Sequence, residues 1–221
     1  MDYTIDEAVR HDLVEYGLDR GADDAAPSNL VAYLLLLARW SATHNLTAVR
    51  DMSQMRVQHL SDCLAVIPSL RRRFHPESPI HVLDVGSGGG LPGVVLSILH
   101  PAWRIDCIDS VAKKAAFIRQ VAGQLQLPRL SAIHGRVERV ERRQPPTYDL
   151  IISRAFSDLR QFVALTRGLL KPDGFLVAMK GKIPEDEIGN LTDQASLITV
   201  ESLEVQGLEA ERCLIYISSQ R

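Results

Sequence analysis

A short apolar run passes into a cluster of glycines at Val82–Gly93, where the sequence is VLDVGSGGGLPG. The run Ile80–Val85 predicts a buried strand, and Leu91–Leu99 predicts a helix whose first turn suits Pro92. Glycine allows a tight turn between the two and lets a ligand approach main-chain atoms without a Cβ in the way. Four glycines within five residues would weaken a fold unless something needs the space. We therefore predict a ligand-binding loop rather than an ordinary glycine-rich turn.

The glycine loop fits two kinds of nucleotide-containing cofactor. Gly88–Gly93 satisfies the G-x-G-x-x-G pattern of dinucleotide-binding proteins, and Asp109 follows about 20 residues later, where a carboxylate can hold ribose hydroxyls of either cofactor. In the dinucleotide form the glycine triplet begins directly at the strand end, whereas here it would begin two residues late. The glycine spacing that starts at Gly86 and follows Asp84 is instead typical of methyltransferases. We predict S-adenosylmethionine as the cofactor, with an NAD(P)-binding oxidoreductase as the alternative.

The chain after residue 80 alternates between short apolar runs and helical patterns. The predicted strands are Ile80–Val85, Ile105–Ile108, Ser131–His134, Leu150–Ile152 and Phe175–Met179, and the predicted helices are Leu91–Leu99, Ala112–Leu125 and Asp158–Leu169. This alternation predicts a parallel sheet flanked by helices. Leu197–Val205 and Arg212–Ser218, with Gly207 between them, predict an antiparallel hairpin. A parallel sheet that closes with an antiparallel hairpin is one mark of methyltransferases, although other proteins also have it. Together with the glycine loop it leads us to predict an α/β protein with the Rossmann-like fold of class I S-adenosylmethionine-dependent methyltransferases, whose mostly parallel seven-stranded sheet ends in this hairpin.

Residues 1–75 show helical patterns. Thr4-Ile5-Asp6-Glu7 is a capping-box sequence at the start of a first helix, and a second helix is predicted from near Pro27-Ser28 through Trp40. A third helix is predicted over about residues 52–70, with apolar positions at Val57, Leu60, Leu64 and Ile67. We therefore predict a helical extension over residues 1–75 and a methyltransferase domain over residues 76–221, together forming one compact unit.

The composition excludes several classes of protein. A length of 221 residues suits one domain of roughly 150–200 residues with a small extension. The hydrophobic share of 46% and the charged share of 24% are those of a globular chain. The longest apolar runs fall far short of the ~20 residues that span a bilayer, and the acidic start lacks the apolar region of a signal peptide. Three widely spaced cysteines, Cys63, Cys107 and Cys213, suit a reducing cytosol, and no His, Asp or Glu cluster has metal-site spacing. We expect a cytoplasmic protein without a membrane partner or a metal.

The net charge of −2 conceals an uneven distribution. Residues 25–182 hold 21 basic and 11 acidic side chains, a net charge of +10, whereas residues 1–24 and 183–221 each hold eight acidic and two basic ones. A basic middle between acidic ends permits an anionic partner such as RNA. Solvated helix faces are the alternative explanation, so the pattern alone does not decide.

Two segments follow predicted strands on the side of the sheet where the glycine loop lies. Asp109 ends the second strand, and Lys113 and Lys114 begin the next helix, where they could contact phosphates or form a solvated face. Val137 and Glu138 follow the third strand, beside the adenine position of this fold. A backbone amide near Val137 and the Glu138 carboxylate could contact the adenine amine, and an ordinary surface charge is the alternative for Glu138.

Polar residues also follow the fourth and fifth predicted strands. Ligands of open parallel sheets bind beyond the carboxyl ends of the strands, where the strand order reverses, which places Ser153 and Arg154 over the site. An arginine that ends an apolar strand seldom serves packing, so we expect Arg154 to be functional. Lys180 and Lys182 end the fifth strand, where they could contact RNA or be solvated. Pro172-Asp173-Gly174 predicts a turn before that strand.

The segment after the fourth strand limits the chemistry. It lacks the Asn/Asp-Pro-Pro-aromatic motif that usually accompanies methylation of the adenine amino group, and it lacks the cysteine nucleophile that methylation of cytosine C5 requires. Cys107, inside the second strand, is expected to be a small buried residue. Guanine N7 carries a lone pair and no proton, so its methylation needs in-line positioning and donors that stabilise developing charge, but no general base. We predict that Arg154 donates to guanine O6 or to a neighbouring phosphate.

Seven segments between about Tyr33 and Lys182 match one known family. They are Asn45–Ala48, His59–Asp62, Leu83–Gly93, Asp109-Ser110 with Lys113-Lys114, Arg136–Glu138, Ser153–Ala155 and Lys180-Gly181. In these segments the chain resembles the bacterial 16S ribosomal RNA guanine-N7 methyltransferase G family, also called the glucose-inhibited division protein B family. The family usually has Asp-Ser-Leu where this chain has Asp62-Cys63-Leu64, a change between small side chains.

The resemblance implies S-adenosylmethionine as methyl donor and one guanine in the decoding-region loop of 16S ribosomal RNA as acceptor. The resemblance, the glycine loop and the expected contact of Asp109 with ribose hydroxyls together give a set of predicted cofactor residues. They are Gly86, Ser87, Gly88, Leu91, Asp109, Val137, Glu138 and Arg154. Asn45, His59 and Asp62 also match the family, and they could either contact substrate or belong to helices packed over the pocket. No segment resembles an RNA-binding module, so recognition of the small ribosomal subunit by its shape is our hypothesis.

Three alternatives stay open on the sequence. One is a small-molecule methyltransferase of the same fold, which the basic middle segment argues against. Another is an NAD(P)-binding oxidoreductase, which only the shifted glycine pattern supports. The third is a module that binds cofactor and RNA without turnover. The sequence does not give the oligomeric state, and a monomer is expected.

Overall fold

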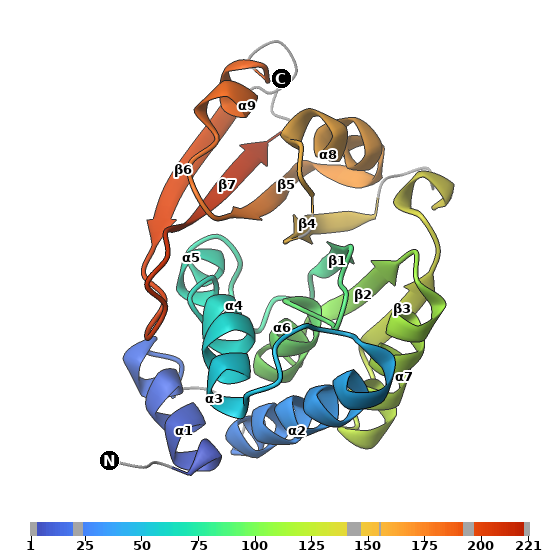
Figure 1. Ribbon diagram of the computed structural model, residues 1–221. Helices are drawn as coiled ribbons and strands as arrows, with labels where there is room; N and C mark the ends of the chain where they lie inside the picture. Colours follow the sequence, from blue (N-terminus) through green and yellow to red (C-terminus); the bar gives the residue numbers. More distant parts are fainter. Residues whose placement is uncertain (1–3, 20–23, 141–146, 155, 192–196, 219–221) are drawn as a thin grey trace.

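Short apolar runs form the strands of one seven-stranded sheet (Figure 1). The computed structural model describes residues 4–19, 24–140, 147–154, 156–191 and 197–218. The strands are β1 (His81–Val85), β2 (Arg104–Asp109), β3 (Leu130–His134), β4 (Tyr148–Ser153), β5 (Leu170–Lys180), β6 (Leu197–Leu203) and β7 (Arg212–Ser218). Their order is β3-β2-β1-β4-β5-β7-β6; the first five in sequence are parallel, and β7 is antiparallel to both β5 and β6. This arrangement confirms the predicted fold class.

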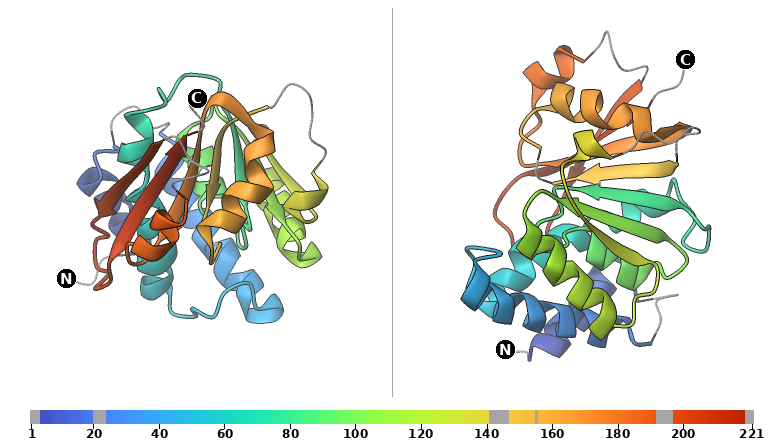
Figure 2. Two further views of the ribbon diagram at one scale, coloured as in Figure 1. Left: turned by 90° about the horizontal axis from the view of Figure 1, so that it is seen from above. Right: turned by 90° about the vertical axis from the view of Figure 1, so that its right-hand side faces the viewer.

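Helices cover both faces of the sheet (Figure 2). The connections include α6 (Gly93–Leu99), α7 (Ala112–Gln124), α8 (Leu159–Thr166), α9 (Glu185–Gly189) and the 3-10 turns η2 (Val137–Arg139) and η3 (Arg167–Leu169). Val82 and Leu150 point into the core beside α6 and α7, whereas their neighbours Leu83 and Ile151 point into the core beside α8. Because both faces are buried, the parallel strands are apolar along most of their length, which is why short apolar runs identify them.

The described part of residues 5–71 is mainly helical, and its helix α2 packs against α6 and α7. The elements are α1 (Ile5–Glu15), α2 (Ala26–His44), α3 (Met52–Met55), the π-helical turn η1 (Arg56–Ser61), α4 (Asp62–Leu64) and α5 (Ile67–Arg71). The capping box predicted at Thr4 is present, because the Thr4 side chain accepts from the Glu7 amide and the Glu7 carboxylate accepts from the Thr4 amide. Pro27 lies in the first turn of α2. The first two predicted helices are therefore confirmed.

The continuous third helix predicted over residues 52–70 is wrong. The segment is helical, but the π-helical turn η1 interrupts it, and α5 begins as a separate helix. Pro68 lies in the first turn of α5, where its missing N–H costs nothing, whereas in the middle of a longer helix it would remove a hydrogen bond. The periodicity of the apolar residues does not reveal either interruption.

The turn predicted at Pro172-Asp173-Gly174 lies inside β5 as a bulge. Tyr148 pairs with Leu170 and Leu150 pairs with Phe175, so β5 holds more residues than β4 over this stretch. Proline cannot donate to the ladder and is tolerated at such a bulge. Pro92 also differs slightly from expectation, since it immediately precedes α6 instead of lying within its first turn.

The β6–β7 hairpin closes the chain onto the N-terminal helices, and Figure 1 shows its turn beside α1. The Gln206 amide donates to the Tyr16 hydroxyl of α1 at 2.9 Å. Gly207, in the same turn, has a positive φ of 76°, and a Cβ there would lie 3.3 Å from Val57 of η1. The β6–β7 turn thus lies against α1 and η1.

Two further properties concern the part of the chain that the structure describes. None of its helices combines the length and the apolar character that crossing a membrane requires. Cys63, Cys107 and Cys213 are buried free thiols. Cys107 lies fully buried in β2, as expected for a small residue inside that strand.

Candidate active site

The loop between β1 and α6 has the backbone shape that its glycines permit. Gly86, Gly88 and Gly90 have positive φ angles of 71°, 57° and 88°, which residues with a Cβ rarely adopt. The Gly86 amide donates to the Ile108 carbonyl oxygen at the end of β2, at 2.9 Å. A Cβ at Gly90 would overlap the Val94 side chain of α6. The spacing that begins at Gly86 is therefore required by the backbone.

Asp84, the acid before the loop, is fully buried beneath it. Its Oδ2 accepts from the Gly93 amide at 2.8 Å and so holds the first turn of α6. A Cβ at Gly93 would overlap the Cys107 sulfur and the Asp84 carboxylate, so α6 can approach the strands this closely only at a glycine. Burial raises the pKa of Asp84 to about 7, although the Gly93 amide acts in the opposite direction. Asp84 supports the loop from behind.

Helix α2 holds the loop from the outside. Tyr33 is fully buried, and its hydroxyl donates to the Gly89 carbonyl oxygen at 2.7 Å. A Cβ at Gly89 would lie 2.9 Å from Leu37 Cδ1 of the same helix. Sequence reasoning missed this contact; the available signal was a tyrosine among the apolar residues of a helix, since a buried hydroxyl needs a partner.

A cavity of about 430 Å³, here called the strand-end cavity, opens beside the loop at the carboxyl ends of β1, β2 and β3. Four predicted cofactor residues line it: Gly86, Asp109, Val137 and Glu138. The Asp109 carboxylate accepts from the Gly88 amide at 3.0 Å and from the Val111 amide at 2.8 Å. Each oxygen keeps further acceptor capacity, so Asp109 can hold the loop and still accept from hydroxyls in the cavity.

Two more cavities lie beyond the strand-end cavity along the same edge of the sheet. The loop cavity, about 240 Å³, is lined by Leu37, Leu46, Thr47, His59, the loop residues Gly86, Ser87, Gly88, Gly89 and Leu91, and Arg154. The arginine cavity, about 400 Å³, is lined by Gln58, His59, Asp62, Arg154, Met179, Lys180, Gly181 and Arg212. Gly86 borders the first two cavities, and His59 and Arg154 border the last two. The three cavities therefore follow one another over the carboxyl edge of the sheet.

Arg154 separates the loop cavity from the arginine cavity. Its Nη1 donates to Asp62 Oδ2 at 3.2 Å and to the Gln58 carbonyl oxygen at 3.4 Å. The preceding Ser153 donates to the Val85 carbonyl oxygen at 2.7 Å, which joins the ends of β4 and β1 where the strand order reverses. This is the place at which open parallel sheets bind ligands. Ala155, which completes the matching segment, lies outside the described residues.

The three residues whose roles the sequence left open lie in different places. Asn45 ends α2 with a positive φ of 51°, and its Oδ1 accepts from Arg50 at 2.6 Å, which is a structural role. His59 borders the loop cavity and the arginine cavity, with Nε2 2.7 Å from the Thr47 hydroxyl. Burial and the neighbouring Arg154 charge lower the pKa of His59, so its imidazole is neutral at pH 7. Asp62 lies at the wall of the arginine cavity.

The four lysines expected near RNA have different surroundings. Lys180 borders the arginine cavity, but its ammonium lies 3.0 Å from the Glu187 carboxylate and its side chain is only 12% exposed, so its charge is balanced within the protein. Lys114 borders the strand-end cavity, 3.6 Å from Asp109. Lys113 and Lys182 are exposed and belong to none of the three linings.

Within the described residues, the site offers binding and positioning groups and no activated nucleophile. Burial raises the pKa of the Cys63 and Cys107 thiols, so neither supplies a thiolate at neutral pH. No group of three or more His, Cys, Asp or Glu side chains in the described ranges could hold a metal ion. The arrangement can therefore hold a nucleoside in the strand-end cavity and orient a second group against Arg154.

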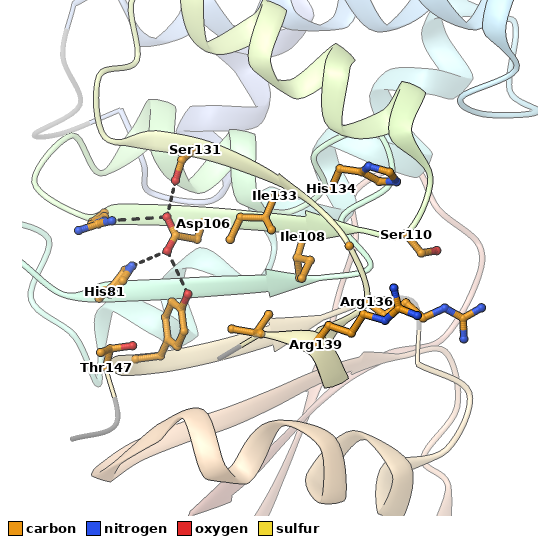
Figure 3. Close-up of a pocket in the computed structure, with 14 residues that line it drawn as sticks. His81, Asp106, Ile108, Ser110, Ser131, Ile133, His134, Arg136, Arg139 and Thr147 are labelled. Atoms are coloured by element: carbon orange, nitrogen blue, oxygen red, sulfur yellow. Dashed lines mark hydrogen bonds and ion pairs between the residues drawn. The ribbon is translucent and has the colours of Figure 1, made fainter. Parts of the chain in front are cut away.

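A further cavity, about 860 Å³, adjoins the strand-end cavity and shares Ile108, Ser110, Gly135 and Arg136 with it (Figure 3). Asp106 of β2 accepts there from His81 at 2.8 Å, from the Tyr148 hydroxyl at 3.0 Å and from Ser131. Burial opposes ionisation of Asp106, but these hydrogen bonds hold its pKa below the usual value. Figure 3 shows Asp106 at one end of the cavity and Arg136 at the other. Because the buried carboxylate accepts three hydrogen bonds from its own neighbours, this cluster stabilises the fold.

Comparisons with known proteins match the chain to one family. The family model for GidB, rRNA small subunit methyltransferase G, matches residues 27–215. A ribosomal RNA small subunit methyltransferase G from Bordetella avium is 48% identical over 201 residues, which cover 91% of this chain and 88% of the relative. One from Leptothrix cholodnii is 50% identical over 194 residues, covering 88% and 87%.

Solved structures show the same fold at low sequence identity. The human methyltransferase 10 domain containing protein is 11% identical, with a TM-score of 0.62 over 87% of this chain and 97% of that one. Fibrillarin from Aeropyrum pernix, crystallised with natively bound S-adenosyl-L-methionine, is 16% identical, with a TM-score of 0.52 over 65% and 68%. The family model matches residues 27–215, and the two relatives are 48% and 50% identical to this chain. The chain therefore belongs to the GidB family, the rRNA small subunit methyltransferases G.

Proposed function

We propose that this protein transfers the methyl group of S-adenosylmethionine to N7 of one guanine in the decoding-region loop of 16S ribosomal RNA. The observation that carries the proposal is the position of Arg154, which borders both the loop cavity and the arginine cavity. A methyl donor at the loop and an acceptor in the arginine cavity would meet at this guanidinium. The name shared by the relatives, ribosomal RNA small subunit methyltransferase G, supports ribosomal RNA as the substrate.

The strand-end cavity and the loop cavity fit the two halves of S-adenosylmethionine. Asp109 would accept from the ribose hydroxyls, the Val137 amide and the Glu138 carboxylate would contact the adenine edge, and Gly86, Ser87, Gly88 and Leu91 would hold the amino-acid half. The fit follows from the donors and acceptors present: main-chain amides without side chains at the loop, and a carboxylate with spare lone pairs beside it. When bound, this cofactor supplies an electrophilic methyl group on a sulfonium.

Guanine N7 suits the groups that line the arginine cavity. Its lone pair is free at neutral pH, so the neutral His59 is not needed as a base. Arg154 would donate to O6 or to a nearby phosphate and leave N7 open for attack. Methylation leaves the guanine ring positively charged, and the Asp62 carboxylate, 3.2 Å from the Arg154 guanidinium, offsets the arginine charge next to that ring. The role of Arg154 is then orientation of the base, which is where most of the acceleration would originate.

We further propose the small ribosomal subunit, complete or in assembly, as the substrate, and a monomeric cytoplasmic enzyme as its catalyst. Chemistry on a base requires the base to leave its stack, which a loop permits more easily than a helix. The helical extension over residues 1–75 and the domain over residues 76–221 would act as one unit, since Tyr33 of the extension bonds the glycine loop.

Transfer of labelled methyl groups tests this proposal. Purified protein is incubated with methyl-labelled S-adenosylmethionine and small subunits that lack the native methylation, and the RNA is digested to nucleosides. Label in N7-methylguanosine is the expected result. Tight cofactor binding without label in the RNA would refute the RNA substrate and favour a small acceptor. A parallel incubation with naked 16S ribosomal RNA tests recognition by subunit shape, since equal rates on both substrates contradict it.

A further inference from the structure

A buried carboxylate holds two arginines at the wall of the arginine cavity. Asp62 accepts from Arg154 through Oδ2 at 3.2 Å and from Arg212 Nε through Oδ1 at 2.8 Å. The Asp62 side chain is only 5% exposed, whereas those of Arg154 and Arg212 are 29% and 27% exposed. One side of each guanidinium is therefore fixed by Asp62, while part of each arginine stays accessible at the cavity.

Only the fold brings these three side chains together. Arg154 lies 92 residues and Arg212 lies 150 residues from Asp62 in the sequence. Asp62 directly follows the π-helical turn η1, a kind of distortion that occurs frequently at functional sites. The Gln58 carbonyl oxygen in this turn accepts from Arg154, so the distorted turn itself contributes to holding the arginine.

The arginine cavity has an excess of positive charge. Among its lining residues, Lys180 is paired with Glu187, and Arg154 and Arg212 share the single carboxylate of Asp62. His59 adds no charge at pH 7, because burial lowers its pKa. One positive charge of the lining residues is therefore unbalanced, and one anionic group would neutralise it. A guanidinium presents the paired donors that match a phosphate.

Building on the proposed function, we propose that Arg212 binds a backbone phosphate of the acceptor nucleotide and that Asp62 is the positioning residue that fixes Arg212 and Arg154. The order of the cavities carries this assignment. Arg154 borders the loop cavity as well, so the base that receives the methyl group lies against it. Arg212 borders the arginine cavity but not the loop cavity, so it meets the part of the nucleotide that is farther from the donor, the sugar–phosphate backbone.

Steady-state transfer to undermethylated small subunits at several salt concentrations tests the role of Arg212. Arg212→Gln is expected to raise the KM for subunits about tenfold, to leave the Kd of S-adenosylmethionine unchanged, and to lower the slope of log KM against log salt by about one, the signature of one lost phosphate contact. Arg212→Lys is expected to keep the slope but to raise the KM. Lysine keeps the positive charge but lacks the planar guanidinium, which can donate to Asp62 and to a phosphate at the same time.

Asp62→Asn tests the positioning role. It is expected to raise the KM about tenfold and to lower kcat, because both arginines lose their shared acceptor, and to add little to the KM of Arg212→Gln when the two are combined. Glu201→Gln is the matched control, because Glu201 bridges Arg72 at 2.6 Å and Arg73 at 2.7 Å and borders none of the three cavities. The control is expected to change the Tm without changing the KM. Thermal unfolding and cofactor Kd of every variant separate folding losses from substrate effects.

The outcomes distinguish the inference from the function on which it rests. Wild-type KM and salt slope in Arg212→Gln overturn the phosphate contact. Fully additive effects of Asp62→Asn and Arg212→Gln on the KM overturn the positioning role. If the wild-type protein methylates no subunit RNA, the proposed function fails and the inference fails with it. Normal transfer by the wild-type protein with unaffected variants refutes the inference alone.

Discussion

Asp84→Asn should make the stability of this protein less dependent on pH. Asp84 is fully buried, with Oδ2 bonded to the Gly93 amide and Oδ1 without a hydrogen-bond partner. Asparagine keeps a carbonyl oxygen for the Gly93 amide and cannot ionise. The substitution therefore removes one titration while leaving the support of the glycine loop in place.

The size of the effect follows from the pKa of this carboxyl group. Burial raises the pKa of Asp84 from 3.8 to about 7 in the folded protein. Between these values the folded state binds a proton that the unfolded state has released, so stability falls as the pH rises, by about 1.4 kcal/mol per pH unit. The stabilising contribution is complete below pH 3.8 and is lost as the pH reaches about 7, a total of about 4 kcal/mol.

Urea unfolding of both proteins at pH 5 and pH 8 measures this difference. All other titrating groups are shared, so the difference in unfolding free energy between variant and wild type isolates Asp84. Between the two pH values the variant should gain about 3 kcal/mol relative to the wild type. A difference that stays constant within about 0.5 kcal/mol would refute the reasoning, since it would mean that Asp84 does not change its protonation on folding.

Other substitutions test the loop and the strand-end cavity. Gly90→Ala should destabilise the protein by about 1–3 kcal/mol in thermal unfolding, because the positive φ and the overlap with α6 both penalise a Cβ, whereas Gly123→Ala, in the open on α7, should be neutral or slightly stabilising. Tyr33→Phe should cost about 1 kcal/mol of stability and weaken cofactor binding, because it removes a buried hydrogen bond to the loop; an unchanged Kd by calorimetry would contradict this coupling. Asp109→Asn should weaken S-adenosylmethionine binding about tenfold, and Lys113→Ala, outside the cavities, should leave it unchanged; equal Kd values for the two variants would show that the carboxylate is not a ligand.

The fold could be predicted because its signals are local. Each parallel strand is a short apolar run buried on both faces, and the glycine loop needs its positive φ angles at the positions where the glycines stand. The Thr4 capping box is likewise contained within four residues. The Pro172-Asp173-Gly174 motif marks a real irregularity, since pairing with β4 passes from Leu170 directly to Phe175, but the motif does not reveal that β5 already begins before it.

The candidate site was predictable only where it follows from the topology. Carboxyl ends of parallel strands share one edge, so Gly86, Asp109 and Val137 were expected near one another, and they line one cavity. The Asp62–Arg212 pair joins a helix of the extension to the last strand, and no local pattern encodes a contact across 150 residues. The ion pair of Lys180 could not be predicted either, because its partner Glu187 lies in the short helix α9, which the sequence patterns did not indicate.

Methyl transfer by the wild-type protein and by Arg154→Gln, compared at saturating S-adenosylmethionine, tests the central claim most directly. Undermethylated small subunits are the acceptor, and methylated nucleosides from the 16S ribosomal RNA are quantified by mass. The account predicts that wild-type protein forms N7-methylguanosine as its product, and that Arg154→Gln forms it about a hundredfold more slowly even though the cofactor is saturating. Methylation of a different nucleoside, or an Arg154→Gln enzyme with the wild-type rate, would contradict it.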